Sequence, residues 1–291
     1  MNFQRLYTAV TVAALLSTSV LAANAQNRYK VGVADIMIIK RQKIGAFQLT
    51  KTIGADGVEV DMGGMGPRPT FDNTLAVDSV RKQFLDKSKE LNIEISSLAM
   101  TGFFAQPFAT RETAVKAVGD CITTMKQMGV KIAFLPLGVS DPGAKPEMRA
   151  AVVERLQQVG KMAEKEGVTI AIGTSLPAKD QLALLKEIGS PAIKSYFNFQ
   201  DALDNNRDLE KELETLGAKN IAMIHCTDTD GQWLQNDPKI DMKKVKATLD
   251  KMGWSGWLIL ERSRDVNDVH NVKKNFGANT AYVKSIFQAA K

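Results

Sequence analysis

The chain has 291 residues, of which 44% are hydrophobic and 24% are charged, and its formal net charge is +6. This length and apolar content suffice for a large buried core, and one α/β barrel domain uses about 250 residues. Basic residues alternate with acidic ones along helical segments, and the sequence has no basic stripe with interleaved aromatic residues. This pattern argues against nucleic-acid binding and indicates a solvated outer surface.

The first 25 residues have the features of a secretory signal peptide. Arg5 precedes an apolar run over 9–21, and Ala23-Asn24-Ala25 forms a small-x-small cleavage site. The apolar run is shorter than the roughly 20 residues that a membrane-spanning helix needs. We therefore predict cleavage after Ala25, a mature domain over 26–291, and a periplasmic or secreted protein that has no membrane association after cleavage.

The chain contains two cysteines, Cys121 and Cys226, which fall in a predicted helix and a predicted strand. Nothing in the sequence brings them to the short separation that a disulfide requires. We predict two buried free thiols, even in an oxidising compartment.

From residue 29 onward, short apolar runs alternate with longer amphipathic stretches, and the pattern gives eight pairs. The runs are almost continuously apolar, as is typical of parallel strands that are buried on both faces. The predicted strands are 29–34, 57–62, 93–100, 131–137, 168–172, 193–199, 221–226 and 257–260.

Segments with helical spacing follow each predicted strand, and several carry start or stop signals. Thr110 is a predicted cap of the helix that follows it. Glycines stand where five of the helices should end, at Gly129, Gly167, Gly189, Gly217 and Gly253. The helices are predicted to begin near Lys40, Asp78, Thr110, Pro146, Lys179, Arg207, Asp241 and Asn271.

Eight βα units predict either a closed (β/α)8 TIM barrel or an open doubly wound sheet. The first strand is followed by Ala34-Asp35-Ile36-Met37 instead of a glycine-rich phosphate loop, which favours the single-domain barrel. Long loops rich in Gly, Pro or aromatic residues follow strands two, three, four and seven. In a barrel these loops build the ligand site at the carboxyl ends of the strands.

Polar side chains that could bind a ligand or take part in catalysis stand at or just beyond several strand ends. Taken singly, each has an ordinary structural explanation, because a histidine there often only satisfies a hydrogen bond and an acid often caps the next helix. Together they predict one polar rim, made by Glu59, Asp61, Asn198, Asp201, His225, Asp228 and Glu261.

Four segments of the second half carry a family resemblance: YFNFQDAL over 196–203, AMIHCTD over 222–228, KIDM over 239–242 and GWLILE over 256–261. In order and spacing they resemble the sugar phosphate isomerase/epimerase family, the xylose isomerase-like TIM barrels. The first half fits mainly through GADGVE over 54–59. The resemblance implies a TIM barrel that acts on a small-molecule carbohydrate.

The resemblance also implies one divalent metal, Mn, Mg, Co or Zn, held at the ends of strands five to eight. Such proteins use a glutamate, an aspartate, a histidine and a glutamate, and the two glutamates move the proton. His225 and Glu261 match the last two positions, whereas Gly173 and Asn198 stand at the first two. The loss of two anionic ligands predicts a degraded metal site, which Asp201 or Asp228 would have to complete.

Further residues are candidates for substrate contacts. Glu59 matches a family glutamate that binds a hydroxyl or organises the barrel floor, and Asp201 and Asp228 are predicted substrate contacts. Arg262 and Arg264 are expected to orient Glu261, to meet an anion, or to form surface ion pairs. Aromatic residues in the rim loops are candidates for the walls of a sugar site: Phe103, Phe104, Phe108 and Trp233.

Three hypotheses follow. The first is an exported isomerase or epimerase for a free or oxidised sugar, with Glu261 and His225 as catalytic residues, or a lyase or hydratase for a keto-sugar as a variant. The second is a non-catalytic carbohydrate-binding barrel that has lost its metal. The third, a scaffold protein, has no positive support except the glycine-rich loop at 62–67. The sequence does not predict the oligomeric state.

Overall fold

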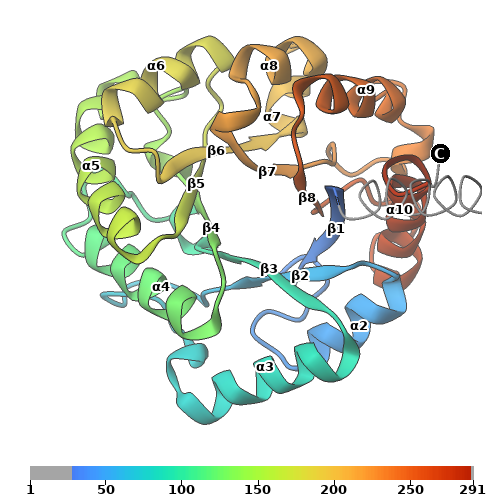
Figure 1. Ribbon diagram of the computed structural model, residues 1–291, viewed down its shortest axis with the longest axis horizontal. Coiled ribbons are helices and arrows are strands. Elements are labelled where there is room, and N and C mark those ends of the chain that lie inside the picture. The colour runs from blue at the N-terminus through green and yellow to red at the C-terminus, as the bar shows by residue number, and fades with distance from the viewer. Residues whose placement is uncertain (1–27, 290–291) are drawn as a thin grey trace, which may run out of the picture.

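The structure is a computed structural model that describes residues 28–289. Eight parallel strands close into a barrel in chain order, and helices surround it (Figure 1). The strands are β1 (Tyr29–Ala34), β2 (Gly57–Asp61), β3 (Glu94–Ala99), β4 (Ile132–Pro136), β5 (Thr169–Gly173), β6 (Ile193–Asn198), β7 (Ile221–His225) and β8 (Gly256–Leu260). The predicted TIM barrel is confirmed for the described residues, whereas the predicted signal peptide lies outside them.

The α-helices occupy the connections between strands. They are α2 (Gly45–Ile53), α3 (Asp78–Leu91), α4 (Ala114–Met128), α5 (Arg149–Glu166), α6 (Ala178–Ile188), α7 (Phe199–Asp204), α8 (Leu209–Leu216), α9 (Met242–Met252) and α10 (Val272–Phe287). None of the described helices is long and apolar enough to cross a membrane. Cys121 on α4 and Cys226 after β7 are both buried and free, as predicted.

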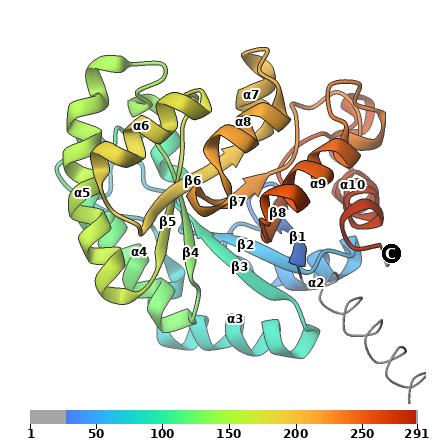
Figure 2. The ribbon, with the colours of Figure 1, turned by 45° about the horizontal axis from the view of Figure 1, so that its top comes forward.

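The helix starts differ from the prediction in three places. Helix α2 begins at Gly45 instead of near Lys40, because the chain first turns back so that the amide of Gln42 donates to Asp35. Thr110 does not cap α4, which begins four residues later at Ala114 and has no side-chain cap. The short helix α7 was not predicted, and it stands next to α8 (Figure 2).

Side chains that point into the barrel form a small cluster of their own, separate from the larger core between strands and helices. Alanines on β1, β3 and β5 leave room that the rings of Phe134 on β4 and Tyr196 on β6 fill. The two rings meet edge to face, with centroids 4.6 Å apart. Such layers of inward side chains close a barrel interior, so any ligand must bind above them at the carboxyl ends of the strands.

Candidate active site

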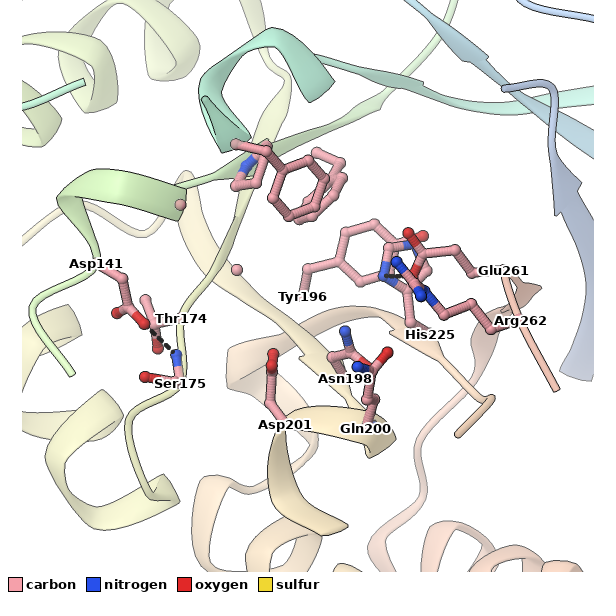
Figure 3. Close-up of a pocket in the computed structure, with 15 residues that line it drawn as sticks. Asp141, Thr174, Ser175, Tyr196, Asn198, Gln200, Asp201, His225, Glu261 and Arg262 are labelled. Carbon is pink, nitrogen blue, oxygen red and sulfur yellow. Dashed lines mark hydrogen bonds and ion pairs between the residues drawn. The ribbon is translucent and has the colours of Figure 1, made fainter. Parts of the chain in front are cut away.

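A cavity of about 200 Å³ lies above this aromatic layer, at the carboxyl ends of β4 to β8. Carboxylates enter it from the segments that follow β4, β6 and β8, and a guanidinium enters from the segment after β8 (Figure 3). Its lining includes Phe104, Phe134, Asp141, Gly173, Thr174, Ser175, Tyr196, Asn198, Gln200, Asp201, His225, Glu261 and Arg262. Convergence of this kind at the carboxyl face is how barrel enzymes build their active sites.

His225, the last residue of β7, lies at the floor of the cavity between two carboxylates. Its Nδ1 is 3.5 Å from an oxygen of Glu261, and its Nε2 is 3.6 Å from an oxygen of Glu59. The ring of Tyr196 stacks on the imidazole with centroids 4.0 Å apart, and Phe134 meets it at 87°. Neighbours on all these sides fix the imidazole plane, so His225 is a preorganised group.

The charges around His225 favour its protonated form. Burial alone would lower the pKa of His225, but the charges of Glu261 and Glu59 outweigh burial and raise it above its ordinary value. Glu59 is itself held by the hydroxyls of Ser97, at 2.7 Å, and Tyr196, at 3.0 Å. The floor of the cavity therefore favours the protonated form of His225, between a buried glutamate and a glutamate that lines the cavity.

Asp201 approaches the cavity from the first turn of α7, where Figure 3 shows its carboxyl pointing into the open space. Asn198 starts this helix, because its side-chain oxygen accepts a hydrogen bond from the amide of Gln200 at 3.0 Å. Burial raises the pKa of Asp201 to about 6, and the charge of Asp141 adds to the effect. A carboxyl group with this pKa can both donate and accept a proton near neutral pH.

The structure places the sequence-predicted residues in three positions: lining the cavity, beneath it, or away from it. Asn198, Asp201, His225, Glu261, Arg262 and Phe104 line the cavity, and Phe104 leaves 47% of its surface exposed. Glu59 lies beneath the cavity, in contact with His225. Phe103 and Phe108 are fully buried and pack against each other, so they belong to the core.

Two predicted substrate contacts do not reach the cavity. Asp228 is buried and turned toward Lys239, whose ammonium lies 2.9 Å from its carboxylate. The indole of Trp233 donates to Asn275 at 2.8 Å, beside α10. Neither residue lines the cavity, and no role in substrate binding follows from their positions.

Sequence reasoning missed several lining residues, among them Phe134, Tyr196, Asp141 and Ser175. Phe134 and Tyr196 point into the barrel from their strands, but the residues next to Phe134 are also apolar, so the sequence gives no signal that separates this inward residue from the outer core. Asp141 accepts hydrogen bonds from the amides of Gly143 and Ser175 at 3.0 and 2.8 Å. Only the folded loops bring Asp141 and Ser175 together, so no spacing in the sequence indicates them.

The side chains present do not fit a divalent metal. Among residues 28–289, no group of three or more His, Cys, Asp or Glu is arranged to hold a metal ion. A Cβ atom placed on Gly173 would lie 2.7 Å from Cε2 of Phe134, so the aromatic ring covers the end of β5. Asn198 uses its side-chain oxygen to cap α7. His225 and Glu261 face each other, Asp228 is paired with Lys239, and among the described residues Asp201 does not join His225 and Glu261 in a group that could hold a metal ion.

Residues 47–285 match the sequence model of the family described as xylose isomerase-like TIM barrel. The chain belongs to the xylose isomerase-like TIM barrel family. The resemblance that the second half of the sequence predicted is thereby confirmed. Comparison of this family member with curated protein sequences gave no significant match.

Solved structures of similar xylose isomerase-like barrels include three sugar-converting proteins. D-allulose 3-epimerase from Methylomonas sp., in complex with D-allulose, is 15% identical, with 89% of this chain and 98% of that chain covered and a TM-score of 0.66. 3-keto-D-glucoside 4-epimerase from E. coli is 14% identical, with 88% of this chain and 99% of that chain covered and a TM-score of 0.68. A sugar phosphate isomerase/epimerase from Parabacteroides distasonis is 12% identical, with 90% of this chain and 96% of that chain covered and a TM-score of 0.69. At these identities the likeness shows a shared fold.

Proposed function

We propose that this protein is an exported isomerase- or epimerase-like enzyme that moves a proton next to the carbonyl group of a free or oxidised sugar. Glu261 and His225 are the catalytic pair, and Asp201 is the second acid–base group. One observation carries the proposal: His225 is fixed between two carboxylates at the floor of a cavity into which Asp201 also points. The names of the structural neighbours, all sugar-converting proteins, support the substrate class.

The reaction needs a base, an acid and a group that stabilises negative charge. Glu261 removes the proton from the carbon next to the carbonyl, and the electron pair of the broken C–H bond gives an enediolate. The imidazole of His225, whose protonated form the neighbouring glutamates favour, stabilises the charge that develops. Asp201 then returns a proton to the opposite face of the same carbon in epimerisation. In isomerisation the proton goes to the former carbonyl carbon, and the hydroxyl proton of the first carbon moves to the former carbonyl oxygen. The sequence of steps is redox-neutral.

These side chains carry the proton transfer in our proposal, and no step is assigned to a metal. Metals are common in related barrels, but the donor set at the ends of β5 and β6 does not fit one. A keto-sugar lyase or hydratase is a close variant, because an enolate formed by Glu261 can also expel a leaving group from the adjacent carbon.

The cavity suits a monosaccharide without a phosphate group. Its volume of about 200 Å³ is small, and the exposed ring of Phe104 offers an apolar wall for the C–H face of a sugar. Export of the chain, predicted from residues 1–25, also favours this substrate, since phosphorylated sugars are chiefly cytoplasmic metabolites. Phe104 and Arg262 are the proposed substrate contacts, while Glu59 acts through His225.

A non-catalytic carbohydrate-binding barrel is the second candidate. Gly173 and Asn198 favour it, because neither can act as a base at the ends of β5 and β6. Solvent exchange separates the two: the mature protein, treated with a chelator, is incubated in D₂O with D-fructose, D-allulose, D-tagatose or the oxidised sugar D-glucuronate, and deuterium in the sugar is followed by NMR. Catalysis predicts incorporation that is lost in Glu261→Gln. Calorimetric binding without incorporation would support the second candidate, and neither binding nor incorporation would overturn both.

A further inference from the structure

Two arginines follow β8, and they have opposite surroundings. Arg264 forms a two-point ion pair with Asp230, with Nε–Oδ1 and Nη2–Oδ2 distances of 3.0 and 2.6 Å. Arg262 lines the cavity, and its guanidinium forms no ion pair or hydrogen bond with any residue in the part of the chain that the structure describes. It is the one arginine or lysine among the described residues that line the cavity.

The turn between the two arginines is held in an unfavourable conformation. Ser263 is fully buried and has φ of 61°, a region that residues other than glycine rarely adopt. Its hydroxyl accepts from the amide of Asp228 at 3.0 Å, and its carbonyl accepts from Asn279 on α10 at 2.8 Å. These contacts stabilise the turn, which sends Arg264 toward Asp230 and Arg262 toward the cavity.

Asp228 has a place in this arrangement although it does not reach the cavity. Its carboxylate is paired with Lys239, and its backbone makes two contacts with the hydroxyl of Ser263. The amide of Arg262 donates to Thr227 at 3.1 Å. The loops after β7 and β8 are thus joined by hydrogen bonds directly behind Arg262, which fixes the start of its side chain. Figure 3 shows the guanidinium reaching over His225, beside Glu261.

Two of the three acidic groups that line the cavity are engaged elsewhere, and the carboxyl of the third, Asp201, forms no ion pair or hydrogen bond with Arg262. Both oxygens of Asp141 accept backbone amides, and Glu261 faces the imidazole of His225. A guanidinium carries five N–H donors in a planar fork that matches a carboxylate. The guanidinium of Arg262 is partly exposed, and no ion pair or hydrogen bond within residues 28–289 uses its donors. The unpaired fork of Arg262 therefore calls for an anionic group on the ligand.

We propose that Arg262 binds the carboxylate of an acidic monosaccharide, a uronate or an aldonate, and so sets the substrate class of the site. This inference rests on the proposed function. A carboxylate is favoured over a phosphoryl group, because one guanidinium matches a single negative charge. A doubly charged phosphoryl group would also lie against Asp141, Asp201 and Glu261, and no lysine among the described residues lines the cavity to offset them.

The test is calorimetric titration of the mature protein with acidic sugars and their neutral counterparts. The pairs are D-glucuronate with D-glucose, D-galacturonate with D-galactose, and D-gluconate with D-sorbitol; glucose 6-phosphate is titrated separately. We expect at least one acid to bind about 10-fold or more tightly than its neutral counterpart. Arg262→Gln should lower that ratio by about 10–100-fold, and Arg262→Lys, which keeps the charge but not the fork, should lower it less.

Lys273→Gln is the matched control, because it removes one positive charge from an exposed residue on α10 that does not line the cavity. Lys273→Gln should keep the wild-type ratio of affinities for the acidic sugar and its neutral counterpart. Equal binding of acids and neutral sugars by the wild type, an unchanged ratio in Arg262→Gln, or tighter binding of glucose 6-phosphate than of every carboxylate would each overturn the inference. If the inference about Arg262 fails but deuterium is still incorporated into neutral ketoses, the proposed function stands. If no sugar binds, the inference and the proposed function both fail.

Discussion

Phe134 on β4 covers Gly173 at the end of β5, so closely that a Cβ atom on Gly173 would lie 2.7 Å from Cε2 of the ring. The same ring meets Tyr196 and His225 edge to face. An aromatic side chain from the neighbouring strand thus fills the space that a longer residue at position 173 would need. The glycine and the phenylalanine form one packing unit, and neither can change freely without the other.

The first prediction concerns this packing. Gly173→Ala should destabilise the protein by about 1–3 kcal/mol, because the added methyl group displaces a packed ring. The matched control is Gly277→Ala on α10, where a Cβ atom meets nothing within 4 Å and helix propensity favours alanine. Urea denaturation measures the free energy of unfolding of both variants. The double variant Phe134→Leu/Gly173→Ala should recover part of the loss, and strictly additive effects of its two substitutions would contradict the coupling.

The second prediction concerns metal content. The mature protein, purified without a chelator and then loaded with manganese or zinc, should retain far less than one metal ion per chain by plasma mass spectrometry. The reason is the donor set, since Gly173 carries no ligand and Asn198 caps α7 with its oxygen. One tightly held ion per chain, lost in His225→Ala, would show instead that the loops rearrange to complete a site.

The third prediction concerns Asp201 and pH. Its pKa is raised from 3.8 to about 6 in the folded protein, so between these pH values the folded state binds more protons than the unfolded state. This contribution to stability is complete below about pH 4 and is lost as the pH rises through 6. Asp201→Asn should therefore be more stable than wild type at pH 7, by about 1–3 kcal/mol, and lose this advantage at pH 4. Denaturation curves at both pH values measure the difference, and a constant offset would contradict it.

The fourth prediction concerns the thiols. Both cysteines are buried, and burial raises the pKa of Cys226 to about 12, so the reactive thiolate is scarce. The native protein should react slowly with a thiol reagent such as dithionitrobenzoate, and two thiols per chain should react after unfolding in guanidinium chloride. Fewer than two reactive thiols after non-reducing unfolding would indicate a disulfide in the isolated protein.

The barrel could be predicted because each strand is a short apolar run that the next helix and glycine delimit. Strand β1, predicted at 29–34, has those same bounds in the structure. Helix α7 could not be predicted in this way, because its six residues are too few to show a helical period. Its existence decides where Asp201 points.

In the candidate site, too, some residues could be predicted from the sequence and others could not. Asp201 and Asp228 each lie three residues beyond a strand-end residue, Asn198 or His225, and the sequence does not distinguish them. The first turn of α7 directs Asp201 into the cavity, whereas Lys239 and Ser263 hold Asp228 outside it. His225 and Glu261 were found because they end apolar strands; Phe134 was missed because an inward aromatic residue has the same pattern as a core residue.

The proposed reaction depends most directly on Glu261 as the base. The decisive measurement is the rate of deuterium incorporation from D₂O into a bound sugar by the chelator-treated protein, compared with Glu261→Gln and with Glu214→Gln. Glu214 is a surface residue paired with Lys251, and it gives a control with the same chemical change. We predict that Glu261→Gln lowers the rate by about 10²–10⁴-fold and that Glu214→Gln leaves it unchanged. A wild-type rate in Glu261→Gln would contradict the proposed function.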